Sequence, residues 1–98
     1  MQLGHPNHAS IDSPAALRRA EERRADARLV TAAAECAARL DRVCADWSPT
    51  RRLEVAYEVA FGRLRSGMPA GAWDALRARY ERHRLEFDAR LVACAVRP

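Results

Sequence analysis

The fold is decided by one stretch, WSPTRRLEVAYEVAFGRLRSGMP (residues 47–69), which holds an amphipathic segment between two proline turns. Its apolar residues recur every three or four positions, which is the spacing of a helix and not of a strand. Ser48 followed by Pro49 is a helix start signal, and Gly67 suits the C-terminal stop of a helix. The stretch therefore predicts a helix over about 49–66.

The rest of the chain carries helix signals of the same kinds. The start signal Ser13-Pro14 predicts a long first helix over about 14–46, and an uninterrupted helical stripe predicts a third helix over about 69–96. Because the loops are short, neighbouring helices are expected to pack roughly antiparallel. The sequence thus predicts one all-α domain over 13–98, either a three-helix bundle or a long helical hairpin with a shorter middle helix.

Three apolar stripes are expected to form the core of this domain. Their members are Leu29, Ala33, Cys36, Leu40, Val43, Cys44 and Trp47, then Leu53, Ala56, Tyr57, Ala60, Phe61 and Leu64, and finally Trp73, Leu76, Tyr80, His83, Phe87, Leu91 and Cys94. When the first stripe is continued at helical spacing toward the N-terminus beyond Leu29, it falls on charged residues. Residues 14–28 are therefore expected to form a charged arm, either solvated or used as a partner surface.

Each helix also carries a second apolar strip, away from its core face. The candidate interface residues in these strips are Leu17, Val55, Val59, Leu85, Val92 and Val96, accompanied on the first helix by Ala20, Ala27, Ala34 and Ala38. Two interpretations stay open: tilted helices of a thin bundle bury both strips, or the strips bind another protein or a second copy. A domain this small has few elements with which to cover a second face, which favours the interface.

Charge offers a second hypothesis. The net charge is +4, and all 17 basic residues are arginine, which is typical of a GC-rich bacterial or phage genome and also suits bidentate anion binding. Candidate anion or nucleic-acid contacts are Arg51, Arg52, Arg77, Arg79, Arg82 and Arg84. The first two lie at a helix N-terminus, where the dipole disfavours cations, so their placement indicates a function. Acidic residues among the others favour a solvated mixed-charge surface.

No catalytic, nucleotide or metal motif is recognisable, so we expect no cofactor, no metal and no enzyme. The lack of lysine excludes Schiff-base chemistry. His83 lies near Glu86, but a lone histidine on an apolar helix face is more typical of packing than of acid–base catalysis. An enzyme would need a pocket where arginines converge with His83 or Tyr80.

The cysteines and the first residues carry little chemistry. Cys36, Cys44 and Cys94 have no CxxC spacing, so they are expected to be free thiols in a reducing cytoplasm. Residues 1–12 are expected to be a flexible leader whose two histidines, His5 and His8, bind no metal. No membrane span is expected.

The composition and patterns together favour a small non-enzymatic helical protein that acts by protein–protein interaction. It would be a regulator, adaptor or inhibitor of bacterial, phage or mobile-element origin, and it would form a homodimer. The alternative is an arginine-rich nucleic-acid-binding protein, which would bind with a steep dependence on salt.

Overall fold

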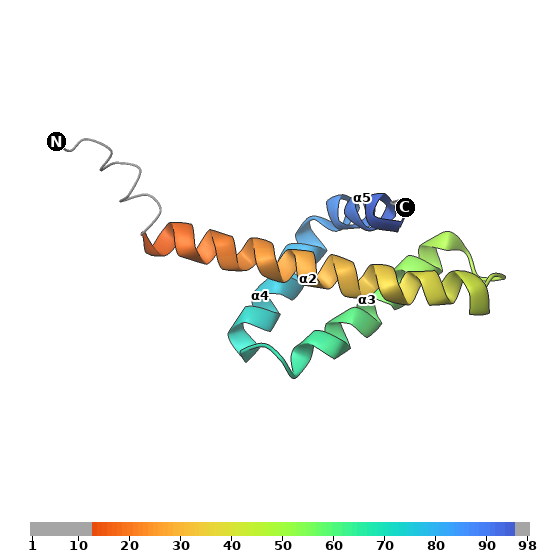
Figure 1. Cartoon of the computed structure of the whole chain (residues 1–98), viewed down its shortest axis with the longest axis horizontal. Coiled ribbons are helices and arrows are strands. Elements are labelled where there is room, and N and C mark those ends of the chain that lie inside the picture. Colours follow the sequence, from red (N-terminus) through yellow and green to blue (C-terminus); the bar gives the residue numbers. More distant parts are fainter. Residues whose placement is uncertain (1–12, 96–98) are drawn as a thin grey trace.

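The computed structural model describes residues 13–95, and this part of the chain is all-α. Its helices are α2 (Pro14–Val43), α3 (Pro49–Arg65), α4 (Ala70–Arg82) and α5 (Arg84–Ala95). The predicted fold class is confirmed, but the expected third helix over 69–96 is in fact two helices, α4 and α5 (Figure 1). Within the described residues, no helix has the length and apolar character needed to cross a membrane.

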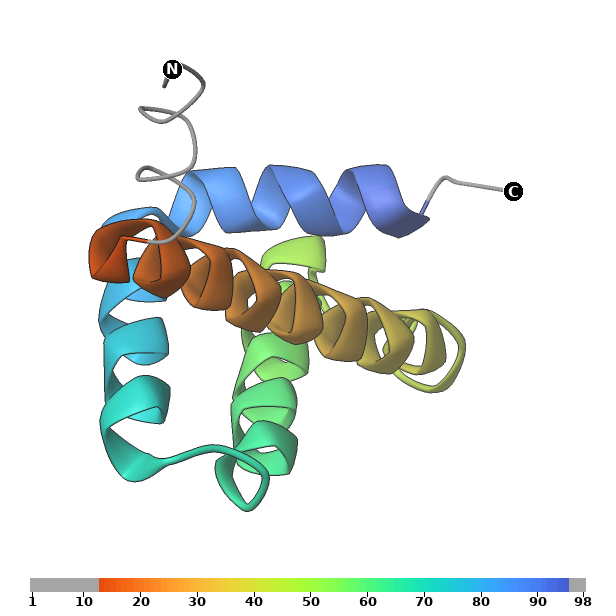
Figure 2. The ribbon, with the colours of Figure 1, turned by 60° about the vertical axis from the view of Figure 1, so that its left-hand side comes forward.

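The described helices make an elongated arrangement whose long axis follows α2 (Figure 1). α2 runs through the middle, and α3 and α4 form an antiparallel hairpin that crosses it (Figures 1 and 2). α5 turns away from α4 and runs beside α2 in the same direction (Figure 2). α2 therefore packs mainly against α3 and, on another side, against α5.

Two serines fix the starts of the first two helices. The Ser13 hydroxyl accepts a hydrogen bond from the Ala16 N–H at 3.0 Å, and the Ser48 hydroxyl accepts one from the Arg51 N–H at 3.2 Å. In each case a proline occupies the first helical turn, where its missing N–H costs nothing. These caps confirm the start positions predicted for the first two helices.

The core confirms most of the predicted stripes. Fourteen side chains of the described residues are buried: Leu29, Val30, Ala33, Cys36, Ala37, Ala56, Tyr57, Ala60, Phe61, Leu64, Leu76, Tyr80, Phe87 and Leu91. Leu29 is the first buried residue of α2, as predicted. The burial of Val30 and Ala37 was not predicted, and it follows from the position of α2 between two partner helices, which widens its buried face.

Three residues that were predicted to lie in the core are exposed, so these predictions are wrong. Val43 is 77 % exposed because it lies in the last turn of α2, beyond the buried part of that helix. Cys94 is exposed near the end of α5, and His83 is exposed at the break between α4 and α5.

The break at His83 is the main departure from the predicted fold. His83 has φ −123° and ψ 38°, outside the helical range, although neither proline nor glycine is nearby. The turn allows Phe87 and Leu91 to pack into the core, where each is only 3 % exposed. Burial of these two side chains against the rest of the fold therefore overrides the local preference for a continuous helix.

Candidate functional site

An apolar groove of about 540 Å³ lies between α2, α3 and α5. α2 lines it with small side chains, among them Ala34 and Ala38, while α3 contributes Leu53. α5 contributes Leu91, which is buried, and Val92, which is 51 % exposed. The groove is therefore lined by aliphatic side chains from three helices that are far apart in sequence.

Charged side chains also line this groove. Glu35 and Asp41 come from α2 and Arg52 from α3. Arg52 Nε lies 3.0 Å from Asp41 Oδ1, whereas Glu35 is exposed and makes no ion pair among residues 13–95. An apolar interior with a few charged groups is the usual anatomy of a protein-binding surface.

Of the six candidate interface residues, Val92 is the one that the structure brings to this groove. The others that it describes lie elsewhere, half-buried or exposed: Leu17 (56 %), Val55 (half-buried), Val59 (38 %) and Leu85 (84 %). Val96 lies outside the described residues. The structure thus does not join the second strips into one continuous face.

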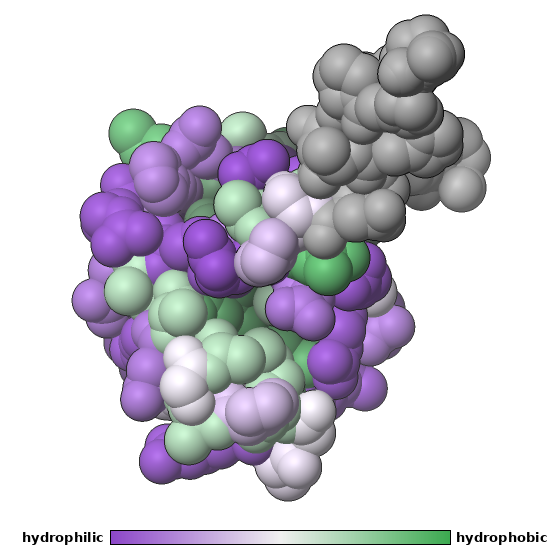
Figure 3. All heavy atoms as spheres, turned by 90° about the vertical axis from the view of Figure 1, so that its left-hand side faces the viewer, coloured by the Kyte–Doolittle hydropathy of each residue, from purple (hydrophilic) through white to green (hydrophobic). Residues whose placement is uncertain are grey.

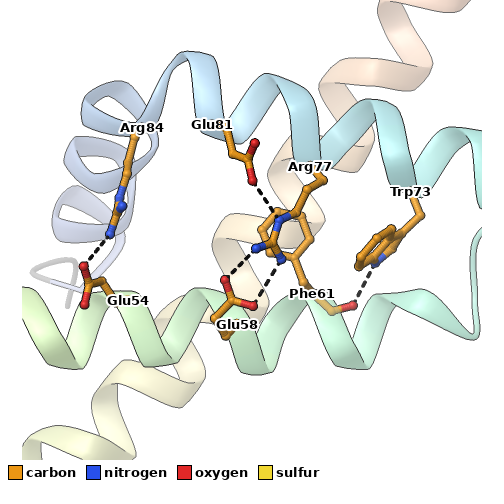
Figure 4. Close-up of polar contacts among 7 residues, drawn as sticks. All are labelled: Glu54, Glu58, Phe61, Trp73, Arg77, Glu81 and Arg84. Atoms are coloured by element: carbon orange, nitrogen blue, oxygen red, sulfur yellow. Dashed lines mark hydrogen bonds and ion pairs between the residues drawn. The ribbon is translucent and has the colours of Figure 1, made fainter.

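The candidate anion-binding arginines are largely engaged within the chain. Arg77 forms a bidentate pair with Glu58, at 3.1 and 2.8 Å, and also bonds Glu81 at 3.3 Å (Figure 4). Its guanidinium lies 4.8 Å from the ring centroid of Phe61. These carboxylates stabilise the charged form and raise the pKa of Arg77, with the Glu58 hydrogen bond contributing most.

Arg79 and Arg84 also bridge helices. Arg79 donates to Asp26 at 2.8 and 3.0 Å and lies 3.7 Å from Glu22, so it ties α4 to the charged arm of α2. Arg84 bonds Glu54 on α3 at 3.1 Å (Figure 4). The arm predicted over residues 14–28 is thus held to α4 by Arg79 rather than fully solvated.

A hollow lies between this arm and α4. It measures about 220 Å³ and is lined by Ala25, Ala72 and Ala75 together with charged residues that include Arg79 and Glu22. Figure 3 looks onto this end of the molecule, where hydrophobic side chains gather around a depression and hydrophilic residues surround them. The alanines permit close approach of the helices, while the ion pairs connect them.

The structure explains the placement of Arg51 and Arg52 without a ligand. Arg52 donates to the carbonyl groups of Cys44 at 3.3 Å and Ala45 at 3.2 Å, and also to that of Trp47. These carbonyls follow the end of α2, where a cation interacts favourably with the helix dipole. The Arg51 guanidinium lies 4.7 Å from the ring centroid of Trp47. Both residues therefore stabilise the turn between α2 and α3.

Arg82 is the remaining candidate, and it is exposed without an ion pair among residues 13–95. Four of the six candidates, Arg52, Arg77, Arg79 and Arg84, make ion pairs with carboxylates. The six arginines consequently do not form a single free basic surface.

Two hollows have the residue types that an enzyme would need. One, of about 540 Å³, is lined by Tyr80, Arg77, Arg84 and three glutamates. The other, of about 320 Å³, includes His83 and Arg79. Arg77, Arg79 and Arg84 are already paired with carboxylates, so their charge is compensated within the chain, whereas Arg90, which also lines the second hollow, lies 5.7 Å from the ring centroid of Phe87.

Asp88 on α5 has the least satisfied side chain in this region. Its Oδ1 atom is buried and has no hydrogen-bond partner among the described residues. Burial raises the pKa of Asp88 and is partly offset by Arg84, while Glu54 raises it further. Burial is also the largest cause that raises the pKa of Tyr57, whose hydroxyl donates to the Phe87 carbonyl at 2.7 Å. The raised pKa of Asp88 implies that its charge opposes folding.

We expect Asp88→Asn to increase the free energy of unfolding at pH 7 by about 0.5–1 kcal/mol, because it removes the negative charge from a buried oxygen that has no partner among the described residues. The folded protein holds the Asp88 proton more tightly than the unfolded chain does. Protonation of Asp88 therefore stabilises the folded protein fully below the unfolded pKa of 3.8, and this stabilisation is lost as pH rises through the folded pKa. The gain from Asp88→Asn should therefore shrink towards about pH 3.

Urea unfolding at both pH values tests this expectation, with Glu21→Gln on the exposed face of α2 as the control. A gain that persists at the acidic pH would contradict it.

Sequence reasoning identified some groove residues and missed the polar contacts. Ala34, Ala38 and Val92 were visible as second-strip residues, and the spacing rule placed Leu53 and Leu91 on core stripes. The pair of Arg79 with Asp26 joins residues 53 positions apart, and no local pattern encodes such a contact.

The metal expectation concerned residues outside the described range. His5 and His8 are not described by the structure, and within residues 13–95 no three His, Cys, Asp or Glu side chains gather as a metal site would require.

Comparison with known proteins adds nothing to this geometry: no protein-family model, curated protein or solved structure matches the chain.

Proposed function

We propose that this is a small non-enzymatic helical protein that acts by binding another protein, as a regulator, adaptor or inhibitor, and that it works as a homodimer. The observation that carries the proposal is the apolar groove between α2, α3 and α5. The proposal includes a cytoplasmic location, which the three free thiols support. It also includes a bacterial or phage origin, which the arginine-only set of basic residues supports.

The groove suits a helix from the partner. Amphipathic helices commonly bind by laying their apolar face into such a groove. Ala34 and Ala38 on α2 would let a partner helix approach closely, while Leu53 and Val92 supply aliphatic contacts on α3 and α5. The free carboxylate of Glu35 would favour a basic residue at the edge of that helix.

The shape of the protein supports self-association. The 30-residue helix α2 is about 45 Å long, whereas a small compact domain is about 30 Å across. An extended molecule leaves more surface in contact with solvent and builds a thinner core. Association with a second copy would therefore stabilise the folded chain.

The nucleic-acid alternative has less support, because four of its six candidate arginines make ion pairs with carboxylates. Fluorescence anisotropy with a labelled DNA duplex and an RNA strand at increasing salt would decide it. A steep fall in affinity with salt would favour this alternative, since each phosphate contact releases counterions.

Val92→Glu is expected to weaken partner binding at least about tenfold, because it places a charge among aliphatic groups. A photo-crosslinking residue at Ala38 would first trap the partner in cells for mass spectrometry, and affinities would then be measured with the purified partner. Leu85→Glu is the matched control, since Leu85 lies on the same helix and does not line the groove. Equal affinities for the two variants would contradict the proposal.

A further inference from the structure

The break between α4 and α5 interrupts a stripe that is continuous in sequence. Leu76, Tyr80, Phe87 and Leu91 follow one another at intervals of four, seven and four positions, which place them on one face of an uninterrupted helix. All four are buried in the bent form. His83 is the residue between the two helices, and it has no special backbone requirement, since its φ is negative. The sequence therefore suits both a bent and a straight arrangement.

The bend interrupts the backbone hydrogen-bond pattern of a continuous helix. Arg84, Leu85 and Glu86 are the first residues of α5, whose N–H groups have no partner within that helix, whereas the Phe87 N–H bonds the His83 carbonyl at 3.1 Å. A straight helix would pair these three N–H groups with the carbonyls four residues earlier, at 80–82. Straightening thus supplies three hydrogen bonds to each chain.

The Tyr80 and Phe87 rings, 5.7 Å apart between centroids, and the His83–Glu86 pair at 2.7 Å join the two sides of the bend, and other contacts come from α3. The Tyr57 hydroxyl on α3 bonds the Phe87 carbonyl at 2.7 Å, and Glu54 on α3 bonds Arg84 at 3.1 Å. Phe87 and Leu91 are buried on the side of α5 that faces the rest of the fold. The contacts that join α5 to α3 and to the α2 face do not depend on α5 belonging to the same chain.

We propose that two copies of this chain dimerise by exchanging α5. In each copy α4 and α5 straighten through His83 into one helix over residues 70–95, about 39 Å long, and α5 packs against α2 and α3 of the partner copy. The exchange is reciprocal, so the dimer is closed and repeats the contacts that α5 makes with α2 and α3 in the bent form. This inference rests on the homodimer of the proposed function and is independent of the groove partner.

Two substitutions at one position test the exchange. His83→Ala and His83→Gly remove the same side chain but differ in helix propensity. Alanine raises the equilibrium constant for forming helix at this position about fivefold per chain relative to glycine. A dimer contains two straightened helices, so its formation should differ by about 20-fold or more. Light scattering coupled to size exclusion, over a range of concentrations, should show a dimer of twice 11.0 kDa that forms roughly 20-fold more readily with alanine than with glycine. Circular dichroism confirms that both variants are folded.

Hydrogen exchange on the unmodified protein provides a second readout that does not depend on a variant. The amides of Arg84, Leu85 and Glu86 should exchange fast in the monomer and become protected in the dimer. Equal dimerisation of the two variants, or a dimer with these amides unprotected, would overturn the exchange and leave the homodimer standing. A monomer under all conditions would overturn both, while the groove proposal would still rest on its own experiment.

Discussion

Tyr57→Ala is expected to lower the free energy of unfolding by about 3–5 kcal/mol, because it removes a fully buried aromatic side chain. The Tyr57 ring lies 4.7 Å from that of Tyr80 and 6.3 Å from that of Phe87, measured between centroids, so it joins α3 to both α4 and α5. Small domains have total stabilities of about 5–15 kcal/mol. The variant should therefore be close to unfolding at 25 °C.

Tyr57→Phe separates the ring from the hydroxyl. It keeps the aromatic contacts and removes only the hydrogen bond to the Phe87 carbonyl, so we expect a loss of about 1–1.5 kcal/mol. Val43→Ala, at a site that is 77 % exposed, should change stability by less than about 0.5 kcal/mol. Urea unfolding followed by circular dichroism measures all three variants. If Tyr57→Ala proved as stable as Val43→Ala, the described core would be incorrect.

The second large effect is expected at Arg79, whose replacement by alanine should cost about 2 kcal/mol. Its side chain is 15 % exposed and that of Asp26 is 17 % exposed, so the substitution leaves a carboxylate largely shielded from water without its partner. Removing one member of a fully buried pair costs about 3–5 kcal/mol, and the remaining solvent contact reduces this value.

Arg82→Ala is the matched control for Arg79, because Arg82 lies on the same helix, is exposed and makes no ion pair among the described residues. Its loss should stay within about 0.5 kcal/mol. The double variant Arg79→Ala with Asp26→Ala should recover part of the cost, since no unpaired carboxylate remains at that site. A purely additive result would show that the two side chains do not interact across α2 and α4.

Local sequence signals were sufficient for much of the fold. Ser13 and Ser48, each followed by proline, predicted the starts of α2 and α3, because a capping hydroxyl and a fixed φ act within a single turn. The apolar stripe of α3 was also predicted, and its members from Ala56 to Leu64 are buried. Such features depend on residues only a few positions apart.

The candidate sites could be predicted only in part. The second-strip residues Ala34, Ala38 and Val92 do line the groove, but the spacing of residues along single helices could not show that they meet. Arg51 and Arg52 were interpreted as functional because a helix N-terminus disfavours cations. The structure instead places the Arg52 guanidinium at the carbonyls that follow α2, eight residues or fewer away in sequence.

The sequence by itself determined that the chain is helical, where α2 and α3 begin and which face of α3 is buried, since these properties arise from periodicity and capping within a few residues. Only the tertiary structure decided that the expected third helix ends at Arg82 and that a second one begins at Arg84. The physical reason is that the bend gives up local backbone hydrogen bonds in exchange for burying Phe87 and Leu91 against α2 and α3, and the surface that buries them is formed by residues distant in sequence.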